Sequence, residues 1–222
     1  MTFKNALQGV KKLFTAEILN LIAIACALVA AVIGLLAVSA TVAGSEGGAV
    51  ASGVGTIVFL AASVVLPIIA FIMHLVGLRQ AGKDEDYFQT AFIYAIFALV
   101  IRVISGVFTL LNVGNGIADN IAMTFSRICE IIVFVLVVYG ITNLADRLHK
   151  SGILGTASKL ITLYIITYGI AIIADLIVIF FPGETSLTIG GIMGIISAIC
   201  SLVAYIIYLV YLGKAKAMLR DN

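Results

Sequence analysis

Hydrophobic residues occur along this chain in long, continuous runs that are separated by short polar segments. A helix needs roughly 20 apolar residues to cross the hydrocarbon core of a bilayer. None of the runs alternates apolar with polar positions, as the strands of a membrane barrel do. We therefore predict an all-α integral membrane protein with six transmembrane helices, over residues 18–42, 56–78, 88–113, 121–144, 160–181 and 189–212.

The basic residues between these spans all lie on one side of the predicted topology. The N-terminal segment, the second and fourth connections and the C-terminal segment carry Lys and Arg, whereas the first, third and fifth connections carry none. Segments rich in Lys and Arg stay in the cytoplasm, so both termini are predicted to be cytoplasmic. The short outer connections at 112–120 and 181–188 predict that neighbouring helices pair as three antiparallel hairpins.

The whole chain, residues 1–222, is expected to form a single six-helix transmembrane domain. Residues 1–15 carry apolar side chains at helical spacing with lysines beside them, which predicts an amphipathic segment in the cytoplasmic interface; an ordinary basic flank explains the pattern equally well. Residues 213–222 read as a cytoplasmic tail. The Gly-rich and Ala-rich connection at 43–55 is expected to be flexible. The compact loops suit a bacterial plasma membrane.

Composition narrows the function classes. Hydrophobic residues make up 63% of the chain and charged residues 11%, and the net charge is only +2 without a basic cluster, so nucleic-acid binding is not expected. No nucleotide-binding, dinucleotide or HExxH motif occurs. The cysteines form no paired or CxxC pattern and are interpreted as small membrane-buried side chains: Cys26, Cys129 and Cys200. We expect no catalytic residues, no metal, no cofactor and no enzyme activity.

Ionisable residues inside the spans are the best clue to function, because a charge at the centre of a membrane helix costs about 2.5–3.5 kcal/mol. The chain has four: Arg102, Arg127, Glu130 and Asp175. In the predicted topology all four lie roughly 9–15 Å below the outer surface. Their charges sum to zero, which predicts pairing, with Arg127 and Glu130 adjacent on one helix and either Glu130 or Asp175 opposite Arg102.

Polar residues continue the helical faces that carry these charges. Spacings of three and four residues place side chains on one face of a helix, and such faces turn toward a bundle interior or a wet cavity in membrane proteins. The sequence therefore predicts a polar centre in the outer half of the bundle, built by the third, fourth and fifth helices. The predicted ligand-binding residues are Arg102, Arg127, Glu130, Asp175, Ser105, Thr109, Thr124 and Tyr168.

Two interpretations of this polar centre stay open. In the first, the protein is a small-solute transporter, a channel or a membrane substrate-binding subunit, in which the arginines hold an anionic group or the carboxylates hold a cation or proton. In the second, it is a non-catalytic membrane scaffold or partner subunit, and the charges are structural ion pairs. The expected partners are the lipid bilayer, a small solute in the first case, and a second copy or another membrane subunit in the second.

The sequence has four weaker features that bear on the fold or the function. Pro67 lies within the second span and predicts a kink, and His74 lies near the cytoplasmic end of that span. The acidic run at 84–86 reads as a solvated turn. The even-numbered spans end on similar sequences with aligned leucines 66 and 68 residues apart, which favours an old hairpin duplication as one explanation of the chain; those leucines are Leu78, Leu144 and Leu212.

Overall fold

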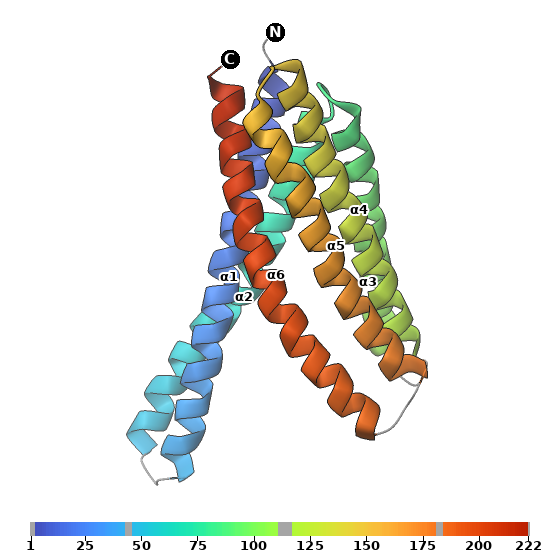
Figure 1. The fold of residues 1–222 in the computed structure, drawn as a ribbon. Coiled ribbons are helices and arrows are strands. Elements are labelled where there is room, and N and C mark those ends of the chain that lie inside the picture. Colours follow the sequence, from blue (N-terminus) through green and yellow to red (C-terminus); the bar gives the residue numbers. More distant parts are fainter. Residues whose placement is uncertain (1–2, 43–45, 111–116, 181–183, 222) are drawn as a thin grey trace. The chain divides into compact units, whose positions relative to one another are not determined.

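A computed structural model describes residues 3–42, 46–110, 117–180 and 184–221, which form six α-helices and no strand (Figure 1). Each helix contains a stretch long and apolar enough to cross a membrane. The predicted all-α class with six span-length helices is thereby confirmed. The helices are α1 (Lys4–Val42), α2 (Glu46–Ala81), α3 (Asp86–Leu110), α4 (Ile117–Arg147), α5 (Ser151–Phe180) and α6 (Glu184–Arg220).

Several helices extend well beyond the apolar runs that predicted them. α1 begins at Lys4, so the segment predicted to be amphipathic continues directly into the first span. α6 ends at Arg220, so most of the predicted tail is also helical. Hydropathy locates only the apolar part of a helix. The backbone hydrogen-bond ladder propagates past it at little cost once a long helix has formed.

The prediction of a flexible connection over 43–55 is wrong for residues 46–55, because α2 begins at Glu46. Glycine has low helix propensity in water, and its frequency in this segment was the reason for the prediction. However, the helix formed by the apolar run that follows propagates into this segment, because each added residue gains a backbone hydrogen bond without the cost of a new nucleus. This gain outweighs the low intrinsic preference of glycine.

The chain divides into two compact units, residues 1–10 with 78–222 and residues 11–77. In the larger unit α4 packs against α3, α5 and α6, and α5 also packs against α6. α4 is therefore the helix around which this unit is built. The α2–α3 connection, the α4–α5 connection and the C-terminal end of α6 lie at the same end of the unit (Figure 1).

The closest packing in the larger unit is at that end. The three leucines that were aligned as a repeat, Leu78, Leu144 and Leu212, are all fully buried there. Phe88 of α3 is fully buried too, and its ring lies where a side chain on Gly140 of α4 would be, 2.8 Å from an added Cβ. The duplication itself stays a prediction, but the aligned positions share one environment.

The smaller unit consists of the rest of α1 and most of α2. Its buried apolar residues include small ones, Ala23, Ala30 and Ala70, whereas large apolar side chains such as Leu28 and Ile57 are exposed. Exposed aliphatic side chains of this kind suit a lipid environment rather than water. Pro67 lies inside α2 and cannot donate the backbone hydrogen bond of its turn; the kink stays a prediction.

Candidate functional site

A charged pair joins α3 to α4 within the apolar stretches of both helices. The Arg102 guanidinium forms an ion pair with the Glu130 carboxylate through Nη2. The Nε of Arg102 donates a second hydrogen bond, 2.9 Å long, to the hydroxyl of Ser126. Ser126 and Glu130 are one helical turn apart on α4 and so meet the same arginine. Of the two partners predicted for Arg102, Glu130 is therefore in contact with it.

This pair is not sealed inside the protein. The side chain of Arg102 is 62% exposed and that of Glu130 is 31% exposed, whereas the hydroxyl partner Ser126 is buried. Arg102 lies within Asp86–Val107, a segment apolar enough to span a membrane. Hydrocarbon cannot solvate a guanidinium of this exposure. The open side of the pair therefore requires a polar neighbour, such as water, a solute or another polar surface.

The structure places the remaining predicted residues as follows. Ser105 on α3 and Thr124 and Arg127 on α4 all take part in interactions with other residues. Spacings of three residues from Arg102 to Ser105 and from Thr124 to Arg127 keep each pair on one helical face. The side chains of Thr109 and Asp175 lie outside the described residues, so the predicted contact between Arg102 and Asp175 has no structural account.

Tyr168 belongs to an aromatic cluster shared by α4, α5 and α6. Its hydroxyl accepts a 3.1 Å hydrogen bond from Tyr164, one turn earlier on α5. The Tyr164 ring stacks on Phe134 of α4 with centroids 3.5 Å apart, and Tyr208 of α6 lies 4.9 Å from Phe134. Stacked rings add to the apolar burial between helices. Tyr168 is thus held by a neighbour that also anchors α5 to α4.

A second polar group links α5 to α6. The hydroxyl of Ser197 on α6 donates a 3.3 Å hydrogen bond to the backbone carbonyl of Thr167 on α5, and both residues are buried. The hydroxyl of Thr167 in turn donates to the carbonyl of Leu163. These contacts satisfy buried hydroxyls within the helix pair, as buried polar groups in a membrane protein require.

The acidic run at 84–86 contains a network that the sequence did not suggest. The Glu85 side chain is only 4% exposed. Asn143 of α4 donates a 2.9 Å hydrogen bond to Oε1 of Glu85, and Arg147 of α4 approaches Oε2 to 3.2 Å. The interpretation as a solvated turn is therefore wrong for Glu85. Asn143 and Arg147 lie one turn apart on α4, and that spacing alone could have indicated paired donors.

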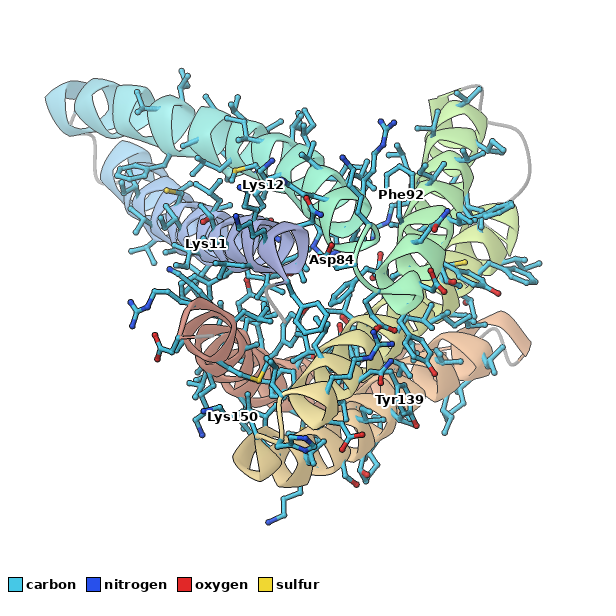
Figure 2. All side chains as sticks on the ribbon, turned by 90° about the horizontal axis from the view of Figure 1, so that it is seen from above. Lys11, Lys12, Asp84, Phe92, Tyr139 and Lys150 are labelled. Atoms are coloured by element: carbon cyan, nitrogen blue, oxygen red, sulfur yellow. The ribbon has the colours of Figure 1, made fainter. Side chains whose placement is uncertain are left out.

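Asp84, next to Glu85, binds the beginning of α1. Its two carboxylate oxygens accept hydrogen bonds from the backbone amide of Ala6 and from the side chain of Asn5, both 2.8 Å long. Figure 2 labels Asp84 next to the N-terminal end of α1. The first four amides of a helix lack intrahelical partners and carry a positive partial charge. Asp84 therefore caps α1 from a distant part of the sequence. The solvated-turn interpretation is wrong for this residue as well.

His74, the weaker candidate of the second span, lies beside a carboxylate of α1. Its Nδ1 is 3.5 Å from Oε1 of Glu17, a residue that is itself buried. The pair ties the two helices of the smaller unit to each other. Among the described residues no cluster of three or more His, Cys, Asp or Glu side chains could hold a metal ion.

Comparison with protein families, characterised proteins and solved structures gives no match for this chain. A function for this chain is therefore inferred from its own residues.

Proposed function

We propose that this chain is a polytopic membrane protein of a plasma membrane, bacterial in type, with both termini in the cytoplasm. Six helices of spanning length support membrane embedding, and the exclusive placement of Lys and Arg in alternate connections supports the orientation. The antiparallel pairing of α3 with α4 and of α5 with α6 is part of this proposal. The contacts within each of these pairs support it.

We propose further that the protein binds or conducts a small solute through the polar centre around Arg102 and Glu130. The observation that carries this proposal is the exposure of the Arg102 guanidinium inside an apolar span, because a charged group in that position needs polar surroundings. The ion pair with Glu130 holds the Arg102 side chain in place. Its open side leaves room for an incoming anion to share the guanidinium, or for a cation to share the carboxylate.

The chemistry of each residue in this centre follows from its donors and acceptors. Arg102 and Arg127 supply fixed cations for a carboxylate or phosphate group. Glu130 and Asp175 supply acceptors for a cation or a proton. The hydroxyl residues hydrogen-bond a bound solute and the water around it: Ser105, Thr109, Thr124 and Tyr168. The proposed role of this group is binding without catalysis.

A second candidate function is that of a non-catalytic scaffold or partner subunit. It is favoured by the pairing itself, since Arg102 already has a carboxylate and a hydroxyl as partners. In this alternative the polar neighbour on the open side of the pair is a second copy or another membrane subunit. The ion pair then fixes the order and register of α3 and α4.

Paired substitutions separate the two candidates. Arg102→Leu alone leaves Glu130 without its cation, and both candidates expect lower thermal stability in micelles. The double variant Arg102→Leu/Glu130→Leu removes both charges and restores stability. If the protein binds a solute at this centre, millimolar succinate or inorganic phosphate raises the melting temperature of the wild type but not that of the double variant.

The readout for the scaffold is different. There, neither anion nor a sodium or proton gradient across proteoliposomes changes the wild type, and the double variant loses wild-type assembly on native gels, because the polar neighbour of the pair is then a partner subunit. Flux or ligand stabilisation that survives the double substitution would contradict the proposed site. A matched control is Arg220→Leu, which removes an exposed arginine at the end of α6.

A further inference from the structure

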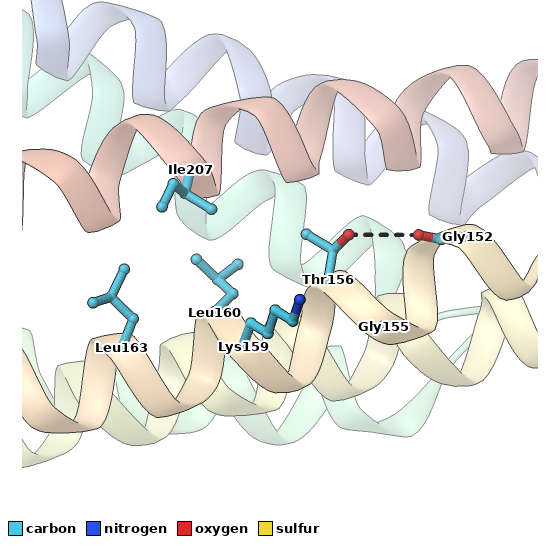
Figure 3. Close-up of a pocket in the computed structure, with 7 residues that line it drawn as sticks. All are labelled: Gly152, Gly155, Thr156, Lys159, Leu160, Leu163 and Ile207. Atoms are coloured by element: carbon cyan, nitrogen blue, oxygen red, sulfur yellow. Dashed lines mark hydrogen bonds between the residues drawn. The ribbon is translucent and has the colours of Figure 1, made fainter.

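A groove of about 500 Å³ runs between α5 and α6, far along the chain from the charged pair of α3 and α4 (Figure 3). It is open on one side. Its lining comes almost entirely from one face of α5, with a single side chain from α6. The lining residues are Gly152, Gly155, Thr156, Lys159, Leu160, Leu163 and Ile207.

The absence of side chains at the two glycines keeps this groove open. A Cβ added to Gly152 or to Gly155 would meet no atom within 4 Å. These residues lie near the beginning of α5, and Thr156 directs its hydroxyl back to the carbonyl of Gly152, 3.5 Å away (Figure 3). The hydroxyl therefore stays within the groove rather than against a neighbouring helix.

The groove changes from polar to apolar along its length. The polar part is formed by the first turns of α5, next to the α4–α5 connection, and Lys159 follows it. The apolar part continues along α5 with Leu160 and Leu163 and includes Ile207 from α6. At 1.5 Å per residue, the polar part from 152 to 159 spans roughly 10 Å, enough to cross the roughly 5–7 Å headgroup region of one leaflet.

Lys159 supplies the charge that selects an occupant. It is exposed, and among the described residues its ammonium has no hydrogen-bond or ion-pair partner. No carboxylate lines the groove. In the proposed orientation this end faces the cytoplasm, where anionic lipids are attracted to Lys and Arg next to the membrane, by about 1 kcal/mol for each residue.

We propose that this groove is a binding site for one anionic phospholipid of the cytoplasmic leaflet. The phosphate of the lipid lies against the Lys159 ammonium, and the Thr156 hydroxyl turns its single proton from the Gly152 carbonyl to a phosphate oxygen. One acyl chain runs along Leu160, Leu163 and Ile207, where it replaces bulk lipid on an apolar surface. The order of polar and apolar lining matches the order of headgroup and chain in a phospholipid. A soluble anion would leave the apolar half of the groove unused.

Tryptophan fluorescence tests this site cleanly, because the chain contains no Trp. A Leu163→Trp variant is reconstituted with phosphatidylglycerol or phosphatidylcholine brominated on the acyl chains, in a background of unbrominated phosphatidylcholine. We expect half-maximal quenching at about fivefold lower mole fraction of phosphatidylglycerol than of phosphatidylcholine, the preference of one lysine. The control is Ile165→Trp, an exposed position on the opposite face of α5, where the two lipids should quench alike.

Two substitutions, each with a matched control, test which residues cause the preference for phosphatidylglycerol. Lys159→Gln should abolish the fivefold difference at Leu163→Trp, whereas Lys150→Gln, which removes another exposed lysine at the same end, should leave it unchanged. Gly155→Leu should fill the groove and reduce the phosphatidylglycerol bound to the otherwise wild-type protein in native mass spectrometry. Gly169→Leu is its control, since Gly169 also faces open space on α5 but does not line the groove.

Each outcome decides the proposal. Equal quenching by the two lipids, or equal effects of Lys159→Gln and Lys150→Gln, would overturn the site. Relief of the quenching by 5 mM inorganic phosphate would assign the groove to a soluble anion and would also overturn it. Because none of these residues belongs to the Arg102 centre, failure of the lipid site leaves the proposed solute function untouched.

Discussion

Two ion pairs of the same chemistry, an arginine with a glutamate, lie in opposite surroundings in this protein. Glu85 and Arg147 meet at the tightly packed end of the larger unit, where the carboxylate is 4% exposed and also accepts from Asn143. Arg102 and Glu130 meet within the spans, where the carboxylate is 31% exposed, while the two arginines, Arg147 at 48% and Arg102 at 62%, are both largely exposed. The first pair completes a packed connection between helices, whereas the second keeps one side open. Burial, rather than charge, therefore distinguishes a structural pair from a candidate site.

The largest predicted effect breaks the packed pair. Glu85→Ala removes the acceptor of Asn143 and the partner of Arg147, and we expect a loss of about 2–3 kcal/mol in the free energy of unfolding. The loss stays below that of a fully buried pair because Arg147 is 48% exposed and regains water. Thermal unfolding in micelles measures it. Glu85→Gln keeps the hydrogen bond from Asn143 and should lose less; equal losses would show that charge and hydrogen bond do not act as described.

A second prediction concerns the packing around that pair. Gly140→Ala places a Cβ 2.8 Å from the Phe88 ring, which is fully buried and cannot move away freely. We expect a loss of about 1–3 kcal/mol from overpacking. Gly106→Ala is the control on α3, since a Cβ there meets nothing within 4 Å, and it should be neutral or slightly stabilising. Similar melting temperatures for the two variants would contradict the close approach of α3 and α4.

A smaller effect is expected at the cap of α1. Asp84→Ala removes the acceptor of the Ala6 amide and the Asn5 side chain, and we expect a loss of about 1 kcal/mol. Hydrogen exchange should show the change as faster exchange of the first turn of α1, with α3 and α4 unaffected. Asp86→Ala is the comparison, because Asp86 lies in the first turn of α3 instead. Uniform loss of protection in both variants would argue against a local cap.

The smallest expected effect stabilises the protein. His149 follows the end of α4 with φ of 53°, in the left-handed region that glycine adopts without strain. The amide of Lys150 donates to the carbonyl of Ala145 across it, 2.9 Å away, as in a Schellman cap. His149→Gly should gain about 0.5–1 kcal/mol, and His149→Val should lose stability. A gain with valine would contradict this cap.

The sequence predicted the class and number of the helices because long apolar runs have few alternatives in a membrane. It also named Glu130 as one of two partners for Arg102, since charges of opposite sign at one depth of a membrane tend to pair, and left the choice between Glu130 and Asp175 open. It did not predict the helical start of α2, where propagation of a long helix outweighs glycine propensity. It missed the Glu85 network because three acidic residues in a polar turn look the same whether they face water or a neighbouring helix.

The groove of α5 and α6 was missed for a related reason. Gly152 and Gly155 are ordinary residues at a helix beginning, and only the presence of Ile207 of α6 in the lining shows that a second helix borders the groove. Spacing along one helix predicts a face. It cannot predict what lies opposite that face when the partner is 50 residues further along the chain.

The central claim is that the centre around Arg102 and Glu130 is wet and open to the outside. Its most direct test is labelling of Ser105→Cys by a membrane-impermeant methanethiosulfonate reagent, in a background with Cys26, Cys129 and Cys200 replaced by alanine. Ser105 is one turn from Arg102, and the substitution removes neither Glu130 nor Ser126, the partners of the Arg102 guanidinium. Ile104→Cys is the lipid-facing control, and Lys150→Cys reports the cytoplasmic side.

In right-side-out vesicles, the account predicts labelling of Ser105→Cys, no labelling of Ile104→Cys, and labelling of Lys150→Cys only after the vesicles are permeabilised. A protected Ser105→Cys in vesicles whose orientation is verified at position 150 would mean that the centre is dry from the outside. That result would contradict the solute-binding proposal and favour the structural role of the pair.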